Sequence, residues 1–519
     1  MRKAMTLGAV FALLAMVFAL VPANVGAPSG GGGQYEAYFI TKPLSSGTWG
    51  PYTRLSYTPT DTRCVMVAAD DDDPGHLVVV YADNLAGQYD WYYRESFDFG
   101  TTWTPQAIAV DPSFEIIVSD MFSCAIDMGD NGYVHMVFCR EKQFNTNQPV
   151  GVYYARFDGT SWTPPIIIKE NLSPGTLWLY TADITVGAND DTIHIAYGSD
   201  YPGNDNGDTW YSRSTDGGNT WSTPVNINQD PAMDVGYRPS LAADSIGNVY
   251  KCNDGGWPGY MWFRRSATNG FTWNPHQQIG NPPLDEHRRP ITMCDDEGNV
   301  YIVYAREAAN FAFRYKYSNN NGITWIPSQT GGFVLSSPIV GMGYWYLAEL
   351  DDYGYIHIAY GSTATGVMET YYMKIDTQGN IIDSPQIITP DDGNPSYPNG
   401  LDVDDDQVYI TTKDYVPLIE ASIEIHPETL NLKSKGKWVT CIIELPEGYD
   451  YMDIDPTTVY LEGDIPAEKP VFTGHSLNVK FDRSALEEKL SPGDGIVLTV
   501  TGQLNNGIGF TGTDTIRAI

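Results

Sequence analysis

The sequence has few cysteines and few basic residues, and these shortages exclude several classes of protein. Six cysteines occur in 519 residues, and none lies in a CxxC pair or another zinc-ligand spacing, so neither a zinc site nor a disulfide scaffold is expected. Lysine and arginine number 30 against 64 aspartates and glutamates, which gives a formal net charge of −34. Because there is also no long basic run, we do not expect nucleic-acid binding.

Long apolar segments are missing as well, apart from one near the N-terminus. Two basic residues precede an apolar stretch from Leu7 to Val21, and small residues follow from Ala23 to Ala27. This order is typical of a secretory signal peptide, which we assign to residues 1–27, with cleavage after Ala23 as an alternative. An uncleaved membrane anchor is the other interpretation, because the stretch is nearly long enough to span a bilayer. We expect a secreted or cell-surface protein, without membrane insertion after signal cleavage.

What the sequence does contain is a repeat of an acidic turn followed by a short apolar strand. Seven copies occur at intervals of roughly 50–60 residues, the period of β-propeller blades. The turns end at Gly75, Gly132, Asp191, Gly247, Gly298, Gly354 and Asp406, and the strands begin at Leu77, Val134, Ile193, Val249, Val300, Ile356 and Val408.

A second motif, SxDxGxTW, follows these strands at a regular offset. Weaker forms occur at 45–49, 158–162 and 376–379. The four good copies contain Ser96, Asp98, Gly100 and Trp103; Ser214, Asp216, Gly218 and Trp221; Ser266, Gly270 and Trp273; and Ser318, Gly322 and Trp325.

This motif resembles the Asp-box, or BNR repeat, of the sialidase-like superfamily of secreted β-propellers. Its residues suit a structural role, because Ser and Asp side chains bond turn backbone, Gly adopts positive φ and Trp packs beneath the sheet. Thr268 and Asn320 replace the Asp in two copies. A residue that varies among equivalent blades is not a unique catalyst, so we assign these loops to structure.

The predicted fold class is all-β. A propeller over residues 28–417 has seven blades, or six if one weak repeat is an insertion. The half-repeats at Tyr35–Ser56 and Pro395–Thr412 are expected to complete one blade and so close the ring. Alternating strands over 418–519 predict a small immunoglobulin-like β-sandwich. This segment is similar to C-terminal modules of secreted prokaryotic proteins, which implies adhesion, spacing or surface attachment.

Some residues could bind metals. His135, His194 and His357 hold one strand position in three repeats, where Tyr stands in others, and inter-blade packing is preferred over a metal site. The acidic runs Asp70–Asp73 and Asp402–Asp406 have the oxygen ligands that calcium takes, although a solvated turn is the simpler interpretation. We assign no metal site and no cofactor, and leave calcium as an option at the acidic turns.

The face opposite the Asp-boxes carries the arginines and aromatic residues that suit a ligand. Arginine can grip a carboxylate in a fork, and aromatic rings can stack on sugars. An ordinary surface rim explains the same residues. The ligand-binding candidates are Arg140, Arg238, Arg289, Arg306, Trp257, Tyr344 and Trp345.

Activity is harder to predict, and we assign no catalytic residue. The Arg-Ile-Pro motif that sialidases carry in the first blade is missing here, and seven repeats differ from the six-bladed sialidase ring. The leading hypothesis is therefore a secreted, non-catalytic propeller that binds a glycan or an extracellular protein. The alternatives are a sialidase-like exo-glycosidase, that is a glycoside hydrolase, and a structural component of a surface layer.

Cys124 and Cys139 flank one acidic turn almost symmetrically. They are expected on facing strands of one hairpin, where a disulfide and a free pair are both open.

Overall fold

The structure is a computed structural model of the chain. It describes residues 33–56, 61–83, 89–110, 124–140, 150–171, 179–187, 191–199, 208–228, 237–255, 260–280, 286–307, 312–328, 332–335, 345–404, 406–434, 436–463, 465–505 and 508–519. The chain divides into two compact units, one of Tyr35–Tyr415 and one of Val416–Ile519 with the residues before Tyr35. The signal-peptide assignment lies outside the described residues. Within them, no helix is long and apolar enough to cross a membrane.

The first unit, called the propeller unit below, consists of four-stranded antiparallel sheets, of which the described residues show seven. Its strands in chain order are β1 (Gly33–Pro43), β2 (Thr53–Arg54), β3 (Thr62–Ala69), β4 (His76–Asp83), β5 (Asp90–Phe97), β6 (Ala107–Ile108), β7 (Cys124–Met128), β8 (Val134–Arg140), β9 (Val150–Phe157), β10 (Ile166–Asn171), β11 (Leu179–Val186), β12 (Ile193–Ser199), β13 (Asp208–Ser214), β14 (Val225–Asn226), β15 (Tyr237–Ala243), β16 (Val249–Asp254), β17 (Met261–Ser266), β18 (Gln277–Gly280), β19 (Glu286–Cys294), β20 (Val300–Glu307), β21 (Ala312–Ser318), β22 (Phe333–Val334), β23 (Tyr346–Leu350), β24 (Tyr355–Ser362), β25 (Glu369–Asp376), β26 (Ile381–Ile387), β27 (Ser396–Val403) and β28 (Gln407–Pro417).

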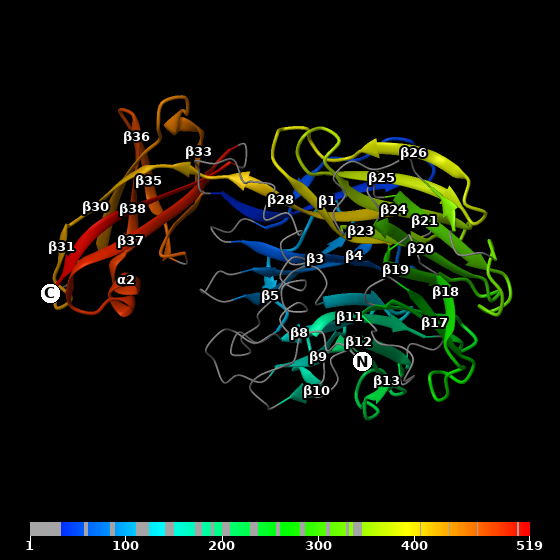
Figure 1. Cartoon of the computed structure of the whole chain (residues 1–519). Coiled ribbons are helices and arrows are strands. Elements are labelled where there is room, and N and C mark those ends of the chain that lie inside the picture. The colour runs from blue at the N-terminus through cyan, green and yellow to red at the C-terminus, as the bar shows by residue number, and fades with distance from the viewer. Residues whose placement is uncertain are drawn as a thin grey trace, which may run out of the picture. The chain divides into compact units, whose positions relative to one another are not determined.

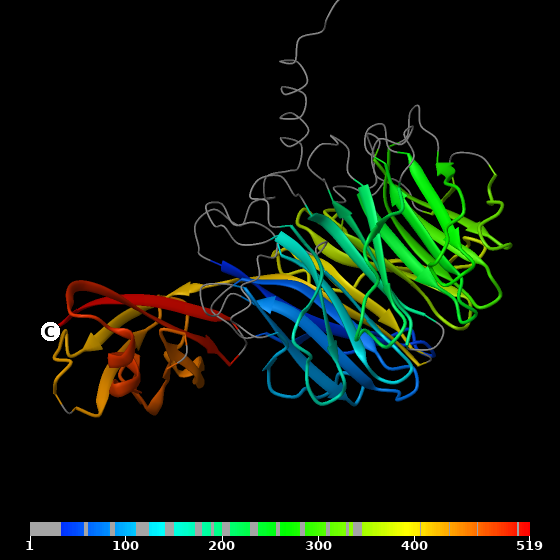
Figure 2. The ribbon, with the colours of Figure 1, turned by 90° about the horizontal axis from the view of Figure 1, so that it is seen from below.

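The sheets follow one another around a common centre, as in a β-propeller (Figure 1). Their inner strands contact in the order β3, β7, β11, β15, β19, β23 and β27, and β27 contacts β3 again. Figure 2 shows the same strands from a second direction. The ring of sheets therefore closes.

One sheet joins the two ends of the ring. Its strand order is β2-β1-β28-β27, so the half-repeats from the two ends of the unit lie in one sheet, and this prediction is confirmed. The pairing of segments some 370 residues apart completes a sheet that neither half could form alone.

The strands are rich in apolar residues where both faces of the sheet are buried. Every residue of β4 (HLVVVYAD) is buried. A strand covered by neighbouring sheets on both sides becomes a continuous apolar run, whereas a half-exposed strand would alternate.

The acidic turns and the Asp-box loops lie together at one end of the sheets, called the turn face below. The amide of Phe99 donates to the carbonyl of Gly75 at 3.2 Å, and Asn321 donates in the same way to Gly298 at 2.8 Å. The opposite end, where each inner strand begins, is called the loop face.

The second unit, called the C-terminal unit, contains two sheets around one apolar core. The sheet orders are β29-β38-β37-β33-β34, with β31 beside β38, and β30-β32-β36-β35. The elements are β29 (Ile419–Glu420), β30 (Ser422–His426), β31 (Thr429–Leu430), β32 (Trp438–Glu444), η1 (Tyr451–Asp453), β33 (Ile454–Leu461), β34 (Ile465–Pro466), β35 (Glu468–Thr473), β36 (Ser476–Asp482), α2 (Arg483–Lys489), β37 (Gly493–Leu504) and β38 (Gly509–Ala518).

The two cysteines of the predicted hairpin lie on its facing strands but on opposite faces of the sheet. Cys124 in β7 is opposite Phe138 rather than Cys139. An offset of one residue reverses the side of a strand side chain, so the two thiols enter different cores. All six cysteines are free thiols in the structure.

Candidate functional site

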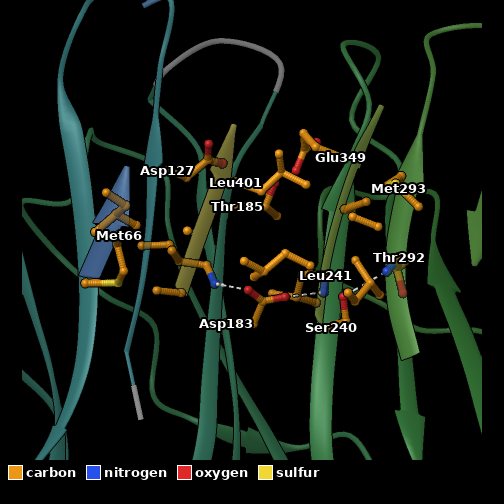
Figure 3. Close-up of a pocket in the computed structure, with 18 of the residues that line it drawn as sticks. Met66, Asp127, Asp183, Thr185, Ser240, Leu241, Thr292, Met293, Glu349 and Leu401 are labelled. Atoms are coloured by element: carbon orange, nitrogen blue, oxygen red, sulfur yellow. Dashed lines mark hydrogen bonds between the residues drawn. The ribbon is translucent and has the colours of Figure 1, made fainter. Parts of the chain in front are cut away.

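A cavity of about 390 Å³ runs along the centre of the propeller unit, lined by the inner strands (Figure 3). Cavities of this size hold small ligands or sugar units. Its wall includes one feature unexpected in apolar strands: carboxylates from four different sheets. These are Asp127 in β7, Asp183 in β11, Glu349 in β23 and Asp402 in β27.

Three of these acids tie neighbouring sheets together. Asp127 accepts the amide of Met128 in its own strand at 2.9 Å and that of Val186 in β11 at 2.7 Å. Asp402 does the same with Val403 and with Ala69 in β3, both at 2.8 Å.

Asp183 repeats the arrangement one step along the ring. It accepts the amides of Ile184 at 3.1 Å and Leu241 in β15 at 2.7 Å. The Ser240 hydroxyl accepts Thr292 N–H in β19 at 2.9 Å, which continues the pattern without a charge. Backbone groups of adjacent inner strands cannot pair with each other here, and these side chains satisfy them.

Glu349 is the exception. It lies opposite His357, as Asp127 lies opposite His135 and Asp402 opposite Tyr409, so the three acids occupy equivalent positions. Within the described residues, its carboxylate accepts one long bond, from Leu350 N–H at 3.4 Å, and none from the next sheet. Glu is one methylene longer than Asp, so its carboxylate lies farther from its own backbone than the bridging carboxylates do.

The channel acids have unusually high pKa values. Burial, and to a lesser extent the charge of Asp127, raises the pKa of Glu349 to about 8. Burial also raises the pKa of Asp127 to about 7 and that of Asp183 to about 6, while their backbone hydrogen bonds act in the opposite direction. Burial and the charge of Glu349 hold the pKa of Asp402 well above its usual value. Titratable groups shifted in this way cluster at sites of acid–base chemistry.

Two of the predicted arginines meet at the loop-face end of the channel. Arg238 in β15 and Arg289 in β19 both line the cavity and both adopt positive φ, 47° and 48°. Each lies at a register shift near the start of its inner strand, so its positive φ belongs to a β-bulge.

One carboxylate joins the two arginine bulges. The Nη1 of Arg238 donates to Asp254 Oδ2 at 3.1 Å, and the backbone amide of Arg289 donates to the same oxygen at 3.2 Å. The Arg289 guanidinium lies 5.3 Å from the ring centre of Tyr346, whose hydroxyl donates to the Arg289 carbonyl. The mouth is thus fixed by contacts among β15, β16, β19 and β23.

An aromatic cluster lies on the neighbouring sheets. Trp345 and Tyr397 pack edge to face with ring centres 5.1 Å apart, and Tyr35 lies 5.8 Å from Tyr397. The Lys413 ammonium lies 5.0–5.6 Å from the centres of all three rings. Trp345 was a predicted ligand-binding residue, whereas sequence analysis missed Lys413.

Of the other predicted ligand-binding residues, one lies away from the channel and the rest are wholly or partly outside the described residues. Arg306 lies in β20, paired with His287 of β19, and it does not line the channel. The backbone of Arg140 ends β8, and its side chain is outside the described set. Trp257 and Tyr344 lie outside the described residues.

The three histidines occupy packing positions. His135, His194 and His357 each place Nδ1 2.6–2.8 Å from a tyrosine hydroxyl in the adjacent strand of the same sheet. In other sheets Tyr250 donates to Asp244 of the acidic turn at 3.0 Å. Within the described residues, no group of three or more potential ligands is arranged to hold a metal ion.

The acidic turns use their carboxylates on backbone groups. Asp70 accepts the amides of Asp72 and Asp73 at 3.1 and 3.2 Å. Asp402, which we had grouped with a solvated acidic turn, instead faces the channel. Calcium at these turns stays a prediction.

The residues of the SxDxGxTW motif make local and inter-sheet contacts. Ser96 Oγ accepts the amide of Gly100 at 2.8 Å, and Asp98 accepts that of Thr102 at 2.7 Å. Thr268 and Asn320, which replace the Asp, accept the corresponding amides at 2.9 Å. The Asp-box tryptophans pack on aromatic rings of the preceding sheet, in the pairs Trp103–Phe39, Trp221–Tyr154, Trp273–Tyr211 and Trp325–Phe263.

No protein-family model matches this sequence, and no curated protein matches it. Solved structures do match. A PL25 polysaccharide lyase, an ulvan lyase, is 12% identical over 70% of this chain and 94% of its own, with a TM-score of 0.47. An α-L-arabinofuranosidase of Fusarium graminearum is 10% identical over 60% of this chain and 93% of its own, with a TM-score of 0.41. The GH43 endo-arabinanase of Bacillus licheniformis is 14% identical over 52% of this chain and 99% of its own, with a TM-score of 0.32.

These structures correct the leading functional hypothesis. Sequence analysis predicted a non-catalytic binding protein, and this prediction is wrong: the three matched structures named above are glycoside hydrolases and a polysaccharide lyase. The hypothesis failed because it considered the arginines of the rim and did not consider the acids inside the apolar inner strands. No residue role is transferred from the matched enzymes, because the identities are 10–14%.

Proposed function

We propose that this protein is a glycan-processing enzyme, a glycoside hydrolase whose reaction takes place in the central channel of the propeller unit. The observation that carries the proposal is Glu349. It holds the position of the sheet-bridging acids, makes no bond to the next sheet within the described residues, and has a pKa raised to about 8. A carboxylic acid that keeps its proton at neutral pH can serve as a general acid.

Two of the channel acids would have different roles in hydrolysis. Glu349 has a higher pKa than Asp127 and stays protonated when Asp127 has ionised. In the proposed reaction the Glu349 proton passes to the glycosidic oxygen as the bond from that oxygen to the sugar carbon breaks. Water adds to that carbon, and its proton passes to the Asp127 carboxylate, whose orientation Val186 N–H fixes.

The loop-face mouth would bind the sugar chain. Arg238 and Arg289 would hold an acidic or hydroxyl-rich sugar, and the rings of Trp345 and Tyr397 would pack against sugar faces. A sialidase-type hydrolase is a narrower form of this proposal, and the arginine pair favours it. Against it, Tyr346 is fully buried with its hydroxyl bonded to Arg289 and Ala305, so it is not placed as a nucleophile.

The proposal includes the finer architecture. The seven sheets would be the blades of one Asp-box propeller, and the C-terminal unit an immunoglobulin-like sandwich. Hydrolysis of polysaccharides would agree with the signal-peptide interpretation, because such substrates lie outside the cell.

The experiment measures reducing ends released from a panel of neutral and acidic polysaccharides, together with a fluorogenic sialoside. We expect release from at least one polysaccharide and none from the sialoside. Glu349→Gln should lower kcat by roughly 10²–10⁴-fold, the usual contribution of a general acid. Glu297→Gln, at an exposed turn, is the matched control and should be unaffected.

Two results would reject the hydrolase. Products that carry an unsaturated sugar, seen by ultraviolet absorption, would assign a lyase instead. Full activity of Glu349→Gln would remove this residue from the chemistry.

A further inference from the structure

The lysines of the C-terminal unit are distributed unusually for so acidic a chain. Residues 429–443 and 469–481 contain no Asp or Glu, yet they contain Lys433, Lys435, Lys437, Lys469 and Lys480. The chain otherwise carries 64 acidic residues in 519.

The fold brings these two stretches into one sheet. β32 pairs with β36, and β36 pairs with the edge strand β35. Val439, Cys441 and Ile443 face the apolar core. Because strand side chains alternate, Trp438 and Thr440 face the other way, and Lys480 lies opposite Thr440 on the same outer face.

Trp438 is the centre of this outer face. The ammonium groups of Lys437 and Lys469 lie 4.7 and 4.5 Å from its ring centre, and both lysines are exposed. The two cations therefore flank an aromatic ring that is itself partly exposed.

The backbone of β35 deviates from a regular strand at the lysine. The register of β35 against β36 shifts between Glu468 and Val471, and Lys469 within this bulge has a φ of 52°. A non-glycine residue in the left-handed region is strained, and bulges commonly redirect a side chain. Here the redirected side chain is the lysine above Trp438.

The acids nearest to this face are engaged. Asp482, opposite Trp438, accepts the amides of Ser484 and Ala485 and so caps α2. On β30, Glu424 pairs with His426 at 3.0 Å. Glu468 lies opposite Lys480 and reduces the positive charge at the bulge.

We infer that this face, formed by Trp438, Lys437, Lys469 and Lys480, binds an acidic polysaccharide outside the channel. The ring would stack on a sugar face, the ammonium groups would pair with carboxylate or sulfate groups, and Thr440 and Asn478 would bond sugar hydroxyls. Charge complementarity selects this occupant, because a basic surface on a protein of net charge −34 attracts a polyanion locally. The inference does not depend on hydrolysis in the propeller unit.

The test is a binding titration of the full chain, in the Glu349→Gln background, with three forms of one polymer: dextran, carboxymethyl dextran and dextran sulfate. We expect binding of the charged forms, none of dextran, and weakening with added salt. Trp438→Ala should weaken binding by roughly tenfold, and Lys437→Glu with Lys469→Glu by more.

The controls separate this face from general effects. Arg517→Glu reverses one charge on the other sheet, at a surface ion pair with Asp494, and should leave affinity unchanged. Tyr449→Ala is the control for Trp438→Ala: it removes another exposed aromatic ring and should leave affinity unchanged. Equal loss in Arg517→Glu, unchanged affinity in the double lysine variant, or binding to phosphatidylglycerol vesicles but to no dextran derivative would overturn the proposal. Loss of hydrolysis alone would not.

Discussion

At the scale of single residues, one methylene group separates the sheet-bridging acids from Glu349, the proposed general acid. Asp127 and Asp402 each accept one amide from their own strand and one from the next sheet. Glu349, at the equivalent position, makes no such bridge within the described residues. An acid that holds two strands together is costly to change, whereas Glu349 is free to exchange a proton.

The pKa of Glu349 predicts the alkaline limit of activity. Hydrolysis should decline as the pH rises through about 8, because the general acid must be protonated. The measurement is a pH profile of kcat. A profile that stays flat to well above pH 8 would contradict the assignment.

The same shift predicts the pH dependence of stability. The folded-state pKa of Glu349, about 8, exceeds its ordinary value of 4.5, so the folded state binds the proton more tightly. Its contribution to stability is complete below pH 4.5 and is lost as the pH rises through about 8. The free energy of unfolding of Glu349→Gln, relative to that of the unsubstituted protein, should therefore be about 2 kcal/mol higher at pH 9 than at pH 5. Urea unfolding at the two pH values measures this difference.

At the scale of elements, the SxDxGxTW loops are held together by local contacts. A serine, an acceptor two residues on and a glycine two further suffice to form the loop. Positive φ is one reason for the glycine, and the structure adds a steric one. In the structure, a Cβ on Gly270 would lie 1.7 Å from the Tyr211 hydroxyl of the preceding sheet.

Two glycines provide a matched test of that contact. Gly270 and Gly159 have similar φ, 74° and 80°, but no atom lies within 4 Å of a Cβ on Gly159. Gly159→Ala should cost about 1 kcal/mol, from backbone strain alone, and Gly270→Ala about 3 kcal/mol because it also overpacks the interface. Chemical unfolding measures both, and equal losses would show that the inter-sheet contact contributes nothing.

At the scale of the whole molecule, ring closure depends on residues from both ends of the propeller unit. Strands β27 and β28 pair with β1 and β2 to complete one sheet. The Asp402 carboxylate then joins β27 to β3.

Two truncations test the closure. A chain ending after Pro417 keeps β28 and should melt cooperatively near the temperature of the full chain's propeller unit. A chain ending after Pro390 loses β27 and β28, which leaves β1 with an open edge and β3 without the strand that packs beside it, and it should aggregate or melt at a lower temperature. Thermal unfolding and gel filtration measure the difference, and identical behaviour would mean that closure is dispensable.

The sequence by itself determined the all-β class, the repeat, the structural loops and the pairing of the two half-repeats. These features rest on short-range chemistry, in which turn residues and apolar runs recur at a fixed period. Only the tertiary structure decided which acids matter, because Asp127, Asp183, Glu349 and Asp402 are each the single carboxylate of an inner strand. Their burial, their altered pKa values and their convergence exist only once the ring brings strands separated by more than 50 residues around one channel. The basic face around Trp438 has the same origin, since its lysines come from two stretches that meet only when β32, β36 and β35 pair.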